Sequence, residues 1–436
     1  MDQFQYPPSR RSTSADFGYG RGASSGFDIA STDLRTWLAQ WPRVLGQLDT
    51  LVVGLKRRQV SGPYNCAQFT VELFRNLVGS CKWGTAGQLM DAVREVGKEL
   101  VAAKPSELAV GNMVRRVLYI IRDEYESSLA SVDGRGSGSL QGSTVPASPS
   151  RGAARKRGGV VGEGAGPVGE GGGGGGLGPS LTGVLGGRSE AIDYGRSSPD
   201  LRQNVVAAIG ELMTELKDMK GIIKEHAKDT IHANEVILTF GNSATVDAFL
   251  KAGADHLGKD GLSFTVIVAE AAPSCSGHLL AKSLAKHGVD TTIISDSAVF
   301  ALMARVNKVI LPTHAVVANG GLIALNGSHA VALAAKDLSV PVVCVTGLFK
   351  LCPLFPHDQD TFNCLLSPAM VMSYKDKDSM KNVEVLNPAY DYIPPNLVDL
   401  YITNMGGLQP SYIYRQLAEY YHRDDLIISP SHDQTA

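Results

Sequence analysis

The sequence predicts an α/β protein, because two kinds of apolar periodicity divide the chain. Between residues 235 and 347, short β-branched runs alternate with amphipathic stretches, the pattern of a parallel sheet with crossover helices. From about residue 31 to residue 130, apolar residues recur at helical spacing instead. We therefore expect an N-terminal helical domain followed by a Rossmann-like, doubly wound, mostly parallel sheet domain.

Six apolar runs are the predicted strands of this sheet. Each is short and bounded by turn-forming residues, as strands buried on both faces are. The runs are 235–240, 264–269, 290–295, 308–311, 314–318 and 341–346. Helical periodicity between them predicts helices at 243–253, 276–287, 296–306 and 328–338.

The helical domain is predicted from capping signals as well as from periodicity. Thr32 or Asp33 is a candidate N-cap for a first helix, and a second helix fits 65–78. Thr85 and Gln88 have capping-box spacing, and a long helix follows Ser106 up to residue 130. The next helix is predicted from Ser198 to about residue 227. We assign 31–132 plus 197–231 to the helical domain and 232–428 to the α/β domain.

Two segments are predicted to be disordered. Residues 1–30 contain no apolar core, so they are interpreted as a tail and not as a secretory signal. Residues 133–196 are rich in glycine, with a run from 171 to 176, and cannot bury enough apolar area to offset their chain entropy. We interpret them as a flexible insertion. After the sheet, we expect a Pro-rich stretch at 351–368, a strand at 383–386, and helices at 396–403 and 411–421.

Composition excludes several classes of protein. The chain has 41 basic and 43 acidic residues, so no overall charge attracts it to nucleic acid or to a membrane surface. Its apolar runs are far shorter than the ~20 residues of a membrane span. Six cysteines without a regular framework predict reduced thiols in the cytosol. We expect no direct nucleic-acid contact, no membrane and no cofactor.

Few residues point to chemistry. The segment after the first strand has one glycine, Gly241, where a dinucleotide fingerprint needs three. The glycines before Ser328 could expose amides to a phosphate, although tight turns need the same residues. Cys275 and His278 could supply two zinc ligands, but a second pair is missing and a structural site takes four. We expect neither a metal site nor a working active site.

Several long motifs resemble one family, the alpha, beta and delta regulatory subunits of eukaryotic translation initiation factor 2B. The resemblance is strongest to the beta branch, above all in residues 345–356. The motifs that carry the resemblance are 105–118, 305–310, 317–321, 327–335, 391–395, 402–407 and 410–415.

The resemblance implies the frame of an enzyme without its chemistry. The family shares its fold with isomerases of ribose-1-phosphate derivatives, in which the first strand ends at a catalytic Cys and a later strand at a catalytic Asp. The matching positions here are Gly241 and His314, and a binding Asn-Lys pair is replaced by Ala324 and Leu325. Glycine has no side chain to act as acid, base or nucleophile. The alternatives left open are a true sugar-phosphate isomerase and a free-standing metabolite-binding protein.

The resemblance also implies partners. It indicates a non-catalytic regulatory subunit of the guanine-nucleotide exchange factor for translation initiation factor 2, which senses phosphorylation of the alpha subunit of factor 2. The chain would pair with a delta subunit and assemble with the alpha, gamma and epsilon subunits. Arg115 and Arg116 are the expected contacts to factor 2. The expected subunit interface is Asn404, Gly406, Gly407, Ser411, Tyr412 and Tyr414, and the expected vestigial ligand pocket is Gly241, His314, Asn319, Gly320, Gly327 and Ser328.

Overall fold

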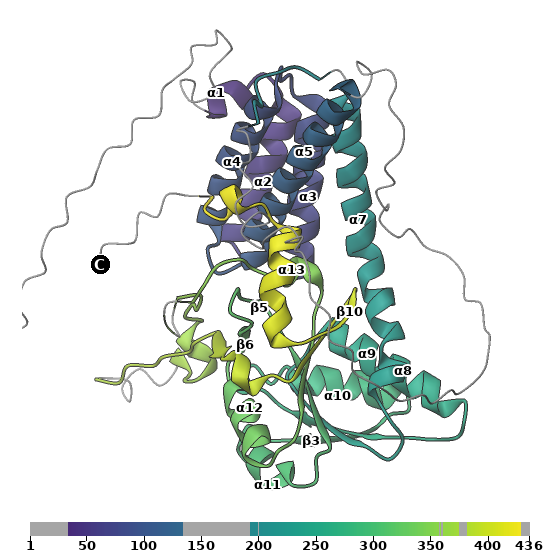
Figure 1. Cartoon of the computed structure of the whole chain (residues 1–436). Coiled ribbons are helices and arrows are strands. Elements are labelled where there is room, and N and C mark those ends of the chain that lie inside the picture. The colour runs from purple at the N-terminus through teal and green to yellow at the C-terminus, as the bar shows by residue number, and fades with distance from the viewer. Residues whose placement is uncertain are drawn as a thin grey trace, which may run out of the picture.

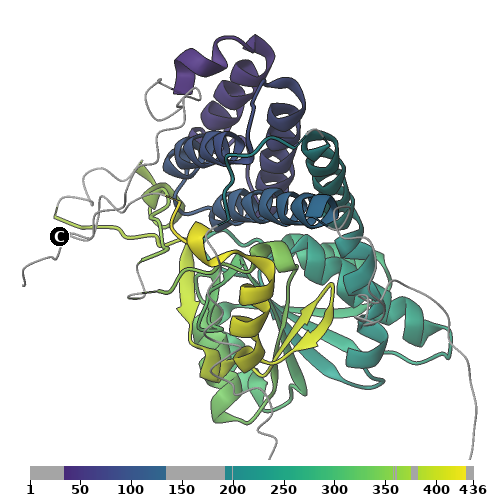
Figure 2. The same cartoon turned by 45° about the horizontal axis from the view of Figure 1, so that its top comes forward.

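The computed structural model describes residues 34–133, 192–198, 200–356, 358, 361–374 and 382–428. A group of long helices stands on a sheet that carries helices on both faces (Figures 1 and 2). The predicted fold class, a helical part followed by a mostly parallel sheet, is confirmed. No helix within the described ranges is long and apolar enough to cross a membrane.

The helical part packs around α5, the helix that contacts α3, α4 and α7. The predicted cap of α4 is confirmed, because Thr85 Oγ1 accepts a hydrogen bond from the backbone N of Gln88 at 3.3 Å. A helix that was not predicted, α2, begins at Pro42. Proline suits this first position because it has no N–H to satisfy. The helices are α1 (Leu34–Leu38), α2 (Pro42–Lys56), α3 (Pro63–Ser80), α4 (Ala86–Ala103), α5 (Leu108–Asp133) and α7 (Leu201–Glu225).

Most of the segments that were expected to be disordered lie outside the described residues, but the end of the second one does not. The ring of Tyr194 packs on the ring of Tyr125 with centroids 5.4 Å apart. Its hydroxyl accepts a hydrogen bond from Arg122 Nη1 at 2.9 Å, and its carbonyl accepts one from Gly87 N. The expectation that the insertion extends to residue 196 is therefore wrong, since packed structure has resumed by residue 192.

The main sheet has seven strands in the order β10-β9-β7-β4-β1-β2-β3. All neighbours are parallel except β10, which runs antiparallel to β9. Since β2 and β4 flank β1 on opposite sides, the strand order reverses at β1, where doubly wound sheets bind ligands. The strands are β1 (Val236–Phe240), β2 (Thr265–Ala269), β3 (Asp290–Ile294), β4 (Lys308–Pro312), β7 (Val342–Val345), β9 (Leu400–Thr403) and β10 (Gly406–Leu408).

Alternate residues of each strand enter two separate cores, as the period of a strand requires. Ile237 and Val266 pack with α7, α9 and α10, whereas Leu238 and Ile267 pack on the opposite face with α11, α12 and α13. Helices therefore cover both faces of the sheet. These helices are α9 (Ala244–Gly258), α10 (Gly277–Lys286), α11 (Val299–Met303), α12 (Ser328–Asp337) and α13 (Ile413–Tyr420), while the four-residue α8 (Ala227–Thr230) joins α7 to β1.

Three predicted elements are wrong. The run 314–318 does not join the main sheet; within it, β5 (Ala315–Val316) pairs antiparallel with β6 (Leu322–Leu325), which pairs with β8 (Tyr390–Ile393) in a second sheet. Residues 383–386 form no strand, and Val383 and Leu386 are exposed. The predicted helix 396–403 is instead a short 3₁₀ turn, η5 (Pro395–Leu397), followed by β9. Strand β9 extends the parallel sheet, with Leu400 in register with Val343.

Candidate functional site

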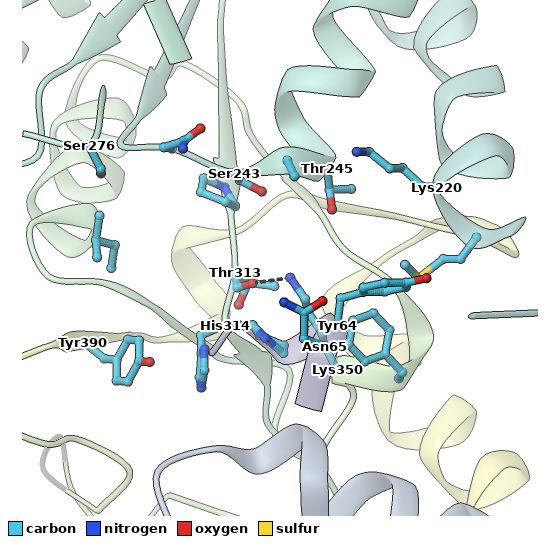
Figure 3. Close-up of a pocket in the computed structure, with 18 of the residues that line it drawn as sticks. Tyr64, Asn65, Lys220, Ser243, Thr245, Ser276, Thr313, His314, Lys350 and Tyr390 are labelled. Carbon is cyan, nitrogen blue, oxygen red and sulfur yellow. Dashed lines mark hydrogen bonds between the residues drawn. The ribbon is translucent and has the colours of Figure 1, made fainter. Parts of the chain in front are cut away.

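A pocket of about 570 Å³ lies where the strand order of the main sheet reverses (Figure 3). Its wall includes the turn between β1 and α9, the end of β4, the start of α3 and two lysines of α7. Both parts of the chain thus contribute to it. The lining side chains with polar groups include Tyr64, Asn65, Lys217, Lys220, Asn242, Ser243, Thr245, Ser276, Thr313, His314, Lys350 and Tyr390.

The end of β1 presents no side chain to this pocket. Gly241 has φ +66°, and a Cβ built there would lie 2.7 Å from Leu325 Cδ2 and 3.3 Å from Ser276 Oγ. Leu325, the last residue of β6, therefore fills the space that a side chain at position 241 would need. A residue other than glycine would be strained there by its conformation as well as by this contact.

His314 lines the pocket, and its ring nitrogen is held by residues of the loop before α5. Its Nε2 donates a hydrogen bond to the carbonyl of Ser106 at 3.1 Å and lies 3.5 Å from Glu107 Oε1. Its ring stacks on Tyr390 with centroids 4.3 Å apart. Burial lowers the pKa of His314, and this effect outweighs the opposing influence of the Glu107 carboxylate. The imidazole is therefore neutral at physiological pH, and it joins the pocket to the loop before α5.

The charged groups behind His314 are held by internal partners. Lys350 is buried, its Nζ donates to the carbonyl of Thr313 at 2.7 Å, and burial lowers its pKa. Glu107 accepts a hydrogen bond from Lys104 Nζ at 3.0 Å. Sequence reasoning missed Lys350 and Glu107, and also the two exposed lysines of α7. Glu107 and Lys350 lie within motifs that carry the family resemblance, but nothing in those motifs marks the two residues as neighbours. They meet only in the folded chain.

The pocket can offer hydroxyl groups and the ammonium groups of Lys217 and Lys220 to an anion. At the end of β1, however, no nucleophile, acid or base is present. Binding without catalysis is therefore the chemistry that this arrangement supports.

Five residues expected in the pocket are not among those that line it: Gly241, Asn319, Gly320, Gly327 and Ser328. Asn319 Nδ2 donates to the hydroxyl of Tyr392 at 2.7 Å, outside the pocket. Gly320 approaches Pro410. Gly327 N and His329 N both donate to Asp391 Oδ2, at 2.7 and 3.1 Å. The start of α12 therefore binds a carboxylate of its own chain, so two of the amides that could have met a phosphate already have a partner.

Arg115 and Arg116 bind the C-terminal segment of their own chain. Arg115 is 5% exposed, and its Nε donates to the carbonyl of Leu426 at 3.0 Å. Arg116 Nη1 donates to the carbonyl of Tyr420 at 3.1 Å, and its guanidinium lies 4.1 Å from the centroid of that ring. Both side chains hold the C-terminal segment against α5. The expected contact of these residues with factor 2 stays a prediction.

The expected interface residues divide into internal and exposed groups. Asn404 is internal, because its Oδ1 accepts from Leu348 N at 3.0 Å and its Nδ2 donates to Glu215 Oε1. Gly406 and Gly407 belong to strand β10. Ser411, Tyr412 and Tyr414 are exposed, with Tyr414 67% accessible. Tyr420 and Tyr421, further along the same segment, belong to the core.

One group of potential metal ligands lies at the end of β2 and the start of α10. Ligand atoms of Glu270, Cys275 and His278 all lie within 4.8 Å of one another. Among the described residues this is the single group of three or more His, Cys, Asp or Glu side chains that meets this distance.

Comparison with known proteins places these features in a family. Residues 59–410 match the initiation factor 2 subunit family. A translation initiation factor eIF2B subunit beta from Dictyostelium discoideum is 40% identical over 399 residues, which cover 87% of this chain and 96% of that protein. A ribose 1,5-bisphosphate isomerase from Archaeoglobus fulgidus is 28% identical over 241 residues, covering 52% of this chain and 73% of the isomerase.

A solved structure agrees with the sequence matches. A chain of the tetrameric eIF2B-beta2-delta2 complex from C. thermophilum superposes with a TM-score of 0.59 and 27% identity, covering 90% of this chain and 99% of that one. The family match spans most of the chain, and the beta-subunit relative is matched over nearly its whole length. The chain therefore belongs to the initiation factor 2 subunit family.

Proposed function

We propose that this chain is a non-catalytic regulatory subunit of eIF2B, the exchange factor for translation initiation factor 2. Its relatives include eIF2B subunits as well as isomerases, so the residues of the pocket have to decide between a regulatory and a catalytic function. The observation that carries the proposal is at Gly241: a Cβ added there would lie only 2.7 Å from Leu325 Cδ2, so the site favours a residue without a side chain.

The two residues in this contact both differ from those of the isomerases that the chain resembles. Gly241 stands where the isomerases that the chain resembles have a catalytic Cys, and Leu325 stands in place of a residue that binds the substrate. The second catalytic position is occupied by His314, which is neutral and hydrogen-bonded to Ser106. A side chain restored at position 241 would have to displace the end of Leu325 and adopt φ +66°, and His314 would still occupy the second catalytic position.

We expect no turnover of ribose 1,5-bisphosphate by the purified chain. The reason is that no group at the end of β1 can accept or deliver a proton. Product formation should stay at the level of the assay without protein, while an authentic archaeal isomerase under the same conditions serves as the positive control. Turnover that disappears in the His314→Ala variant would contradict the proposal.

The proposed assembly has a delta subunit as the direct partner. The C. thermophilum complex is a tetramer of two beta and two delta subunits, and the beta-like fold of this chain supports an equivalent role. We extend the proposal to the alpha, gamma and epsilon subunits, to the alpha subunit of factor 2 as the regulated partner, and to the cytosol as the compartment. The division into a helical domain, 31–132 plus 192–231, and an α/β domain, 232–428, is proposed as the domain organisation.

Tyr414 tests the assembly. We expect Tyr414→Ala to weaken binding to the delta subunit at least tenfold, which is about 1.4 kcal/mol, because exposed tyrosines often anchor interfaces. The variant should change the free energy of unfolding by no more than about 0.5 kcal/mol, since Tyr414 is 67% exposed. Binding is measured by co-purification and titration with the delta subunit, and folding by urea denaturation.

Tyr420→Ala is the matched control on the same helix. Tyr420 is 6% exposed and lies beneath the Arg116 guanidinium, so this variant should lose stability by about 3–5 kcal/mol. The interface proposal fails if Tyr414→Ala binds the delta subunit like the unmodified chain.

A further inference from the structure

The loop between β2 and α10 brings three different metal-binding groups together. Glu270 follows β2, Cys275 lies in the loop, and His278 is in the first turn of α10. Carboxylate, thiolate and imidazole are the three protein ligands that zinc accepts. The sequence shows Cys275 and His278 as an incomplete pair, and the fold adds Glu270 as the third ligand.

The distances suit one small ion. With Zn–N and Zn–O bonds of about 2.0–2.1 Å and a Zn–S bond of about 2.3 Å, neighbouring ligand atoms of a tetrahedral site lie roughly 3.3–3.6 Å apart. His278 Nε2 and Glu270 Oε2 are 3.5 Å apart without an ion. All three ligand atoms lie within 4.8 Å of one another. Closing the set around zinc therefore needs movements of about 1 Å, which partly exposed side chains make by small rotations about their own bonds.

The backbone that carries the three groups is held in place. Asp296 accepts hydrogen bonds from Ala271 N at 2.9 Å and Ala272 N at 2.7 Å. At Gly277, an added Cβ would lie 2.3 Å from the carbonyl oxygen of Ala269, so α10 starts in close contact with β2. Anchoring on both sides of Cys275 lowers the entropy lost when the ligands converge on an ion.

We propose that Glu270, Cys275 and His278 form a zinc site with one coordination position open to solvent. Three protein ligands plus a water molecule make a complete tetrahedral shell. The thiolate and imidazole select zinc against magnesium and calcium, which prefer oxygen ligands. Cys275 is exposed and the His278 side chain is 57% exposed, so the fourth position faces solvent.

The proposed zinc site lies next to the pocket, and its three ligands are different residues from the charged groups that contact His314. Ser276, which lines the pocket, lies directly between Cys275 in the loop and Gly277 at the start of α10. A bound ion would fix this wall of the pocket by cross-linking the end of β2 to the first turn of α10.

The chain contains suitable controls. His287 Nε2 lies 2.8 Å from Asp255 Oδ1 at the other end of α10. This imidazole–carboxylate pair is not joined by a cysteine among the described residues. Cys364 is half-buried and is the one other cysteine that is not fully buried. Burial raises the pKa of the Cys66, Cys81 and Cys344 thiols to about 12, so these three cysteines stay protonated.

The test uses the full chain and Co²⁺ as a spectroscopic probe for zinc. We expect a thiolate-to-cobalt charge-transfer band that is abolished by one equivalent of Zn²⁺ and is absent from Cys275→Ser. His278→Gln and Glu270→Gln should weaken cobalt binding by more than the ~10–100-fold that loss of an outer-shell partner costs. His287→Gln and Cys364→Ser should bind cobalt like the unmodified chain. Magnesium should not displace the probe.

A second measurement avoids mutation altogether. In the unmodified chain, Zn²⁺ should protect Cys275 from alkylation, as measured by peptide mass spectrometry, while Cys364 reacts at the same rate with and without the ion. The proposal is overturned if saturating cobalt gives no charge-transfer band, if the band persists in Cys275→Ser, or if zinc leaves the alkylation rate of Cys275 unchanged.

Discussion

Replacing Asp425 with alanine is expected to lower the free energy of unfolding by about 3–5 kcal/mol. Asp425 is 1% exposed and lies in η7 (Arg423–Asp425), near the end of the described chain. Its carboxylate accepts hydrogen bonds from Arg122 Nε at 2.8 Å and from Arg94 Nη2 at 2.9 Å. The Arg122 side chain is 6% exposed, so truncation of Asp425 leaves a buried guanidinium without its counter-charge. Urea denaturation of the full chain measures the loss.

Asp424→Ala is the control for this variant. Asp424 is the adjacent residue, its side chain is 68% exposed, and its Oδ2 is 3.9 Å from Arg122 Nη1. An exposed pair of this kind contributes roughly 0–1 kcal/mol. If the two alanine variants were equally stable, the buried pair would not be what holds the C-terminal segment.

The same contact predicts a dependence on pH. Burial alone would raise the pKa of Asp425, but the hydrogen bonds from Arg122 and Arg94 outweigh it, so the pKa in the folded chain lies below the ordinary value of 3.8. A depressed carboxylate pKa stabilises the fold fully above the unfolded-state value, and this contribution is lost as pH falls through the folded-state value. The stability difference between the unmodified chain and Asp425→Ala should therefore be constant near neutral pH and shrink below pH 3.8.

Gly320→Ala should cause a loss of similar size for a different reason. Gly320 has φ +80°, and a Cβ there would lie 2.7 Å from the carbonyl oxygen of Pro410. The backbone conformation alone costs an alanine about 1–3 kcal/mol. Displacing the Pro410 backbone adds about 1–3 kcal/mol more. Urea denaturation measures the sum.

Gly288→Ala separates the two contributions to this loss. Gly288 has φ +87°, and no atom lies within 4 Å of the position of its Cβ. This variant should therefore show the conformational cost without the steric one. Equal losses in the two alanine variants would show that the approach of Pro410 to Gly320 contributes nothing.

The sequence predicts the parallel strands well because their signal is local. The runs beginning at 235, 264, 290, 308 and 341 are short, apolar and β-branched, and each became a strand within one residue of its predicted start. Helices of the helical part are predicted for the same reason: Thr85 caps α4 through atoms only three residues apart. Local patterns of this kind survive in any tertiary context that buries both faces of a sheet.

Elements that depend on distant neighbours are not predicted. Residues 314–318 have the composition of a buried strand, but the chain turns at Gly320 and pairs antiparallel with β6. Strand β9 was predicted as a helix, because its partner β7 lies more than fifty residues earlier and leaves no mark on its periodicity. The polar side chains behind His314 come from the loop between α4 and α5 and from the segment after β7, so only the fold brings Glu107 near Lys350.

Glu270 illustrates the same limit at a shorter range. A spacing rule that expects zinc ligands in pairs stops at Cys275 and His278, whereas the end of β2 places a carboxylate 3.5 Å from the imidazole. A strand end that is fixed in space can serve as a ligand without belonging to any motif.

The contact of Arg122 with Asp425 also constrains when the chain can finish folding during its synthesis. The two residues are 303 positions apart. At about 5–20 residues per second, the ribosome needs on the order of 15–60 s to add that stretch. Throughout this interval α1 to α4 have been made, but the guanidinium of Arg122 lacks its carboxylate. A chain that terminates early would retain that defect permanently, so completeness at the C-terminus is a condition for stability near the N-terminus.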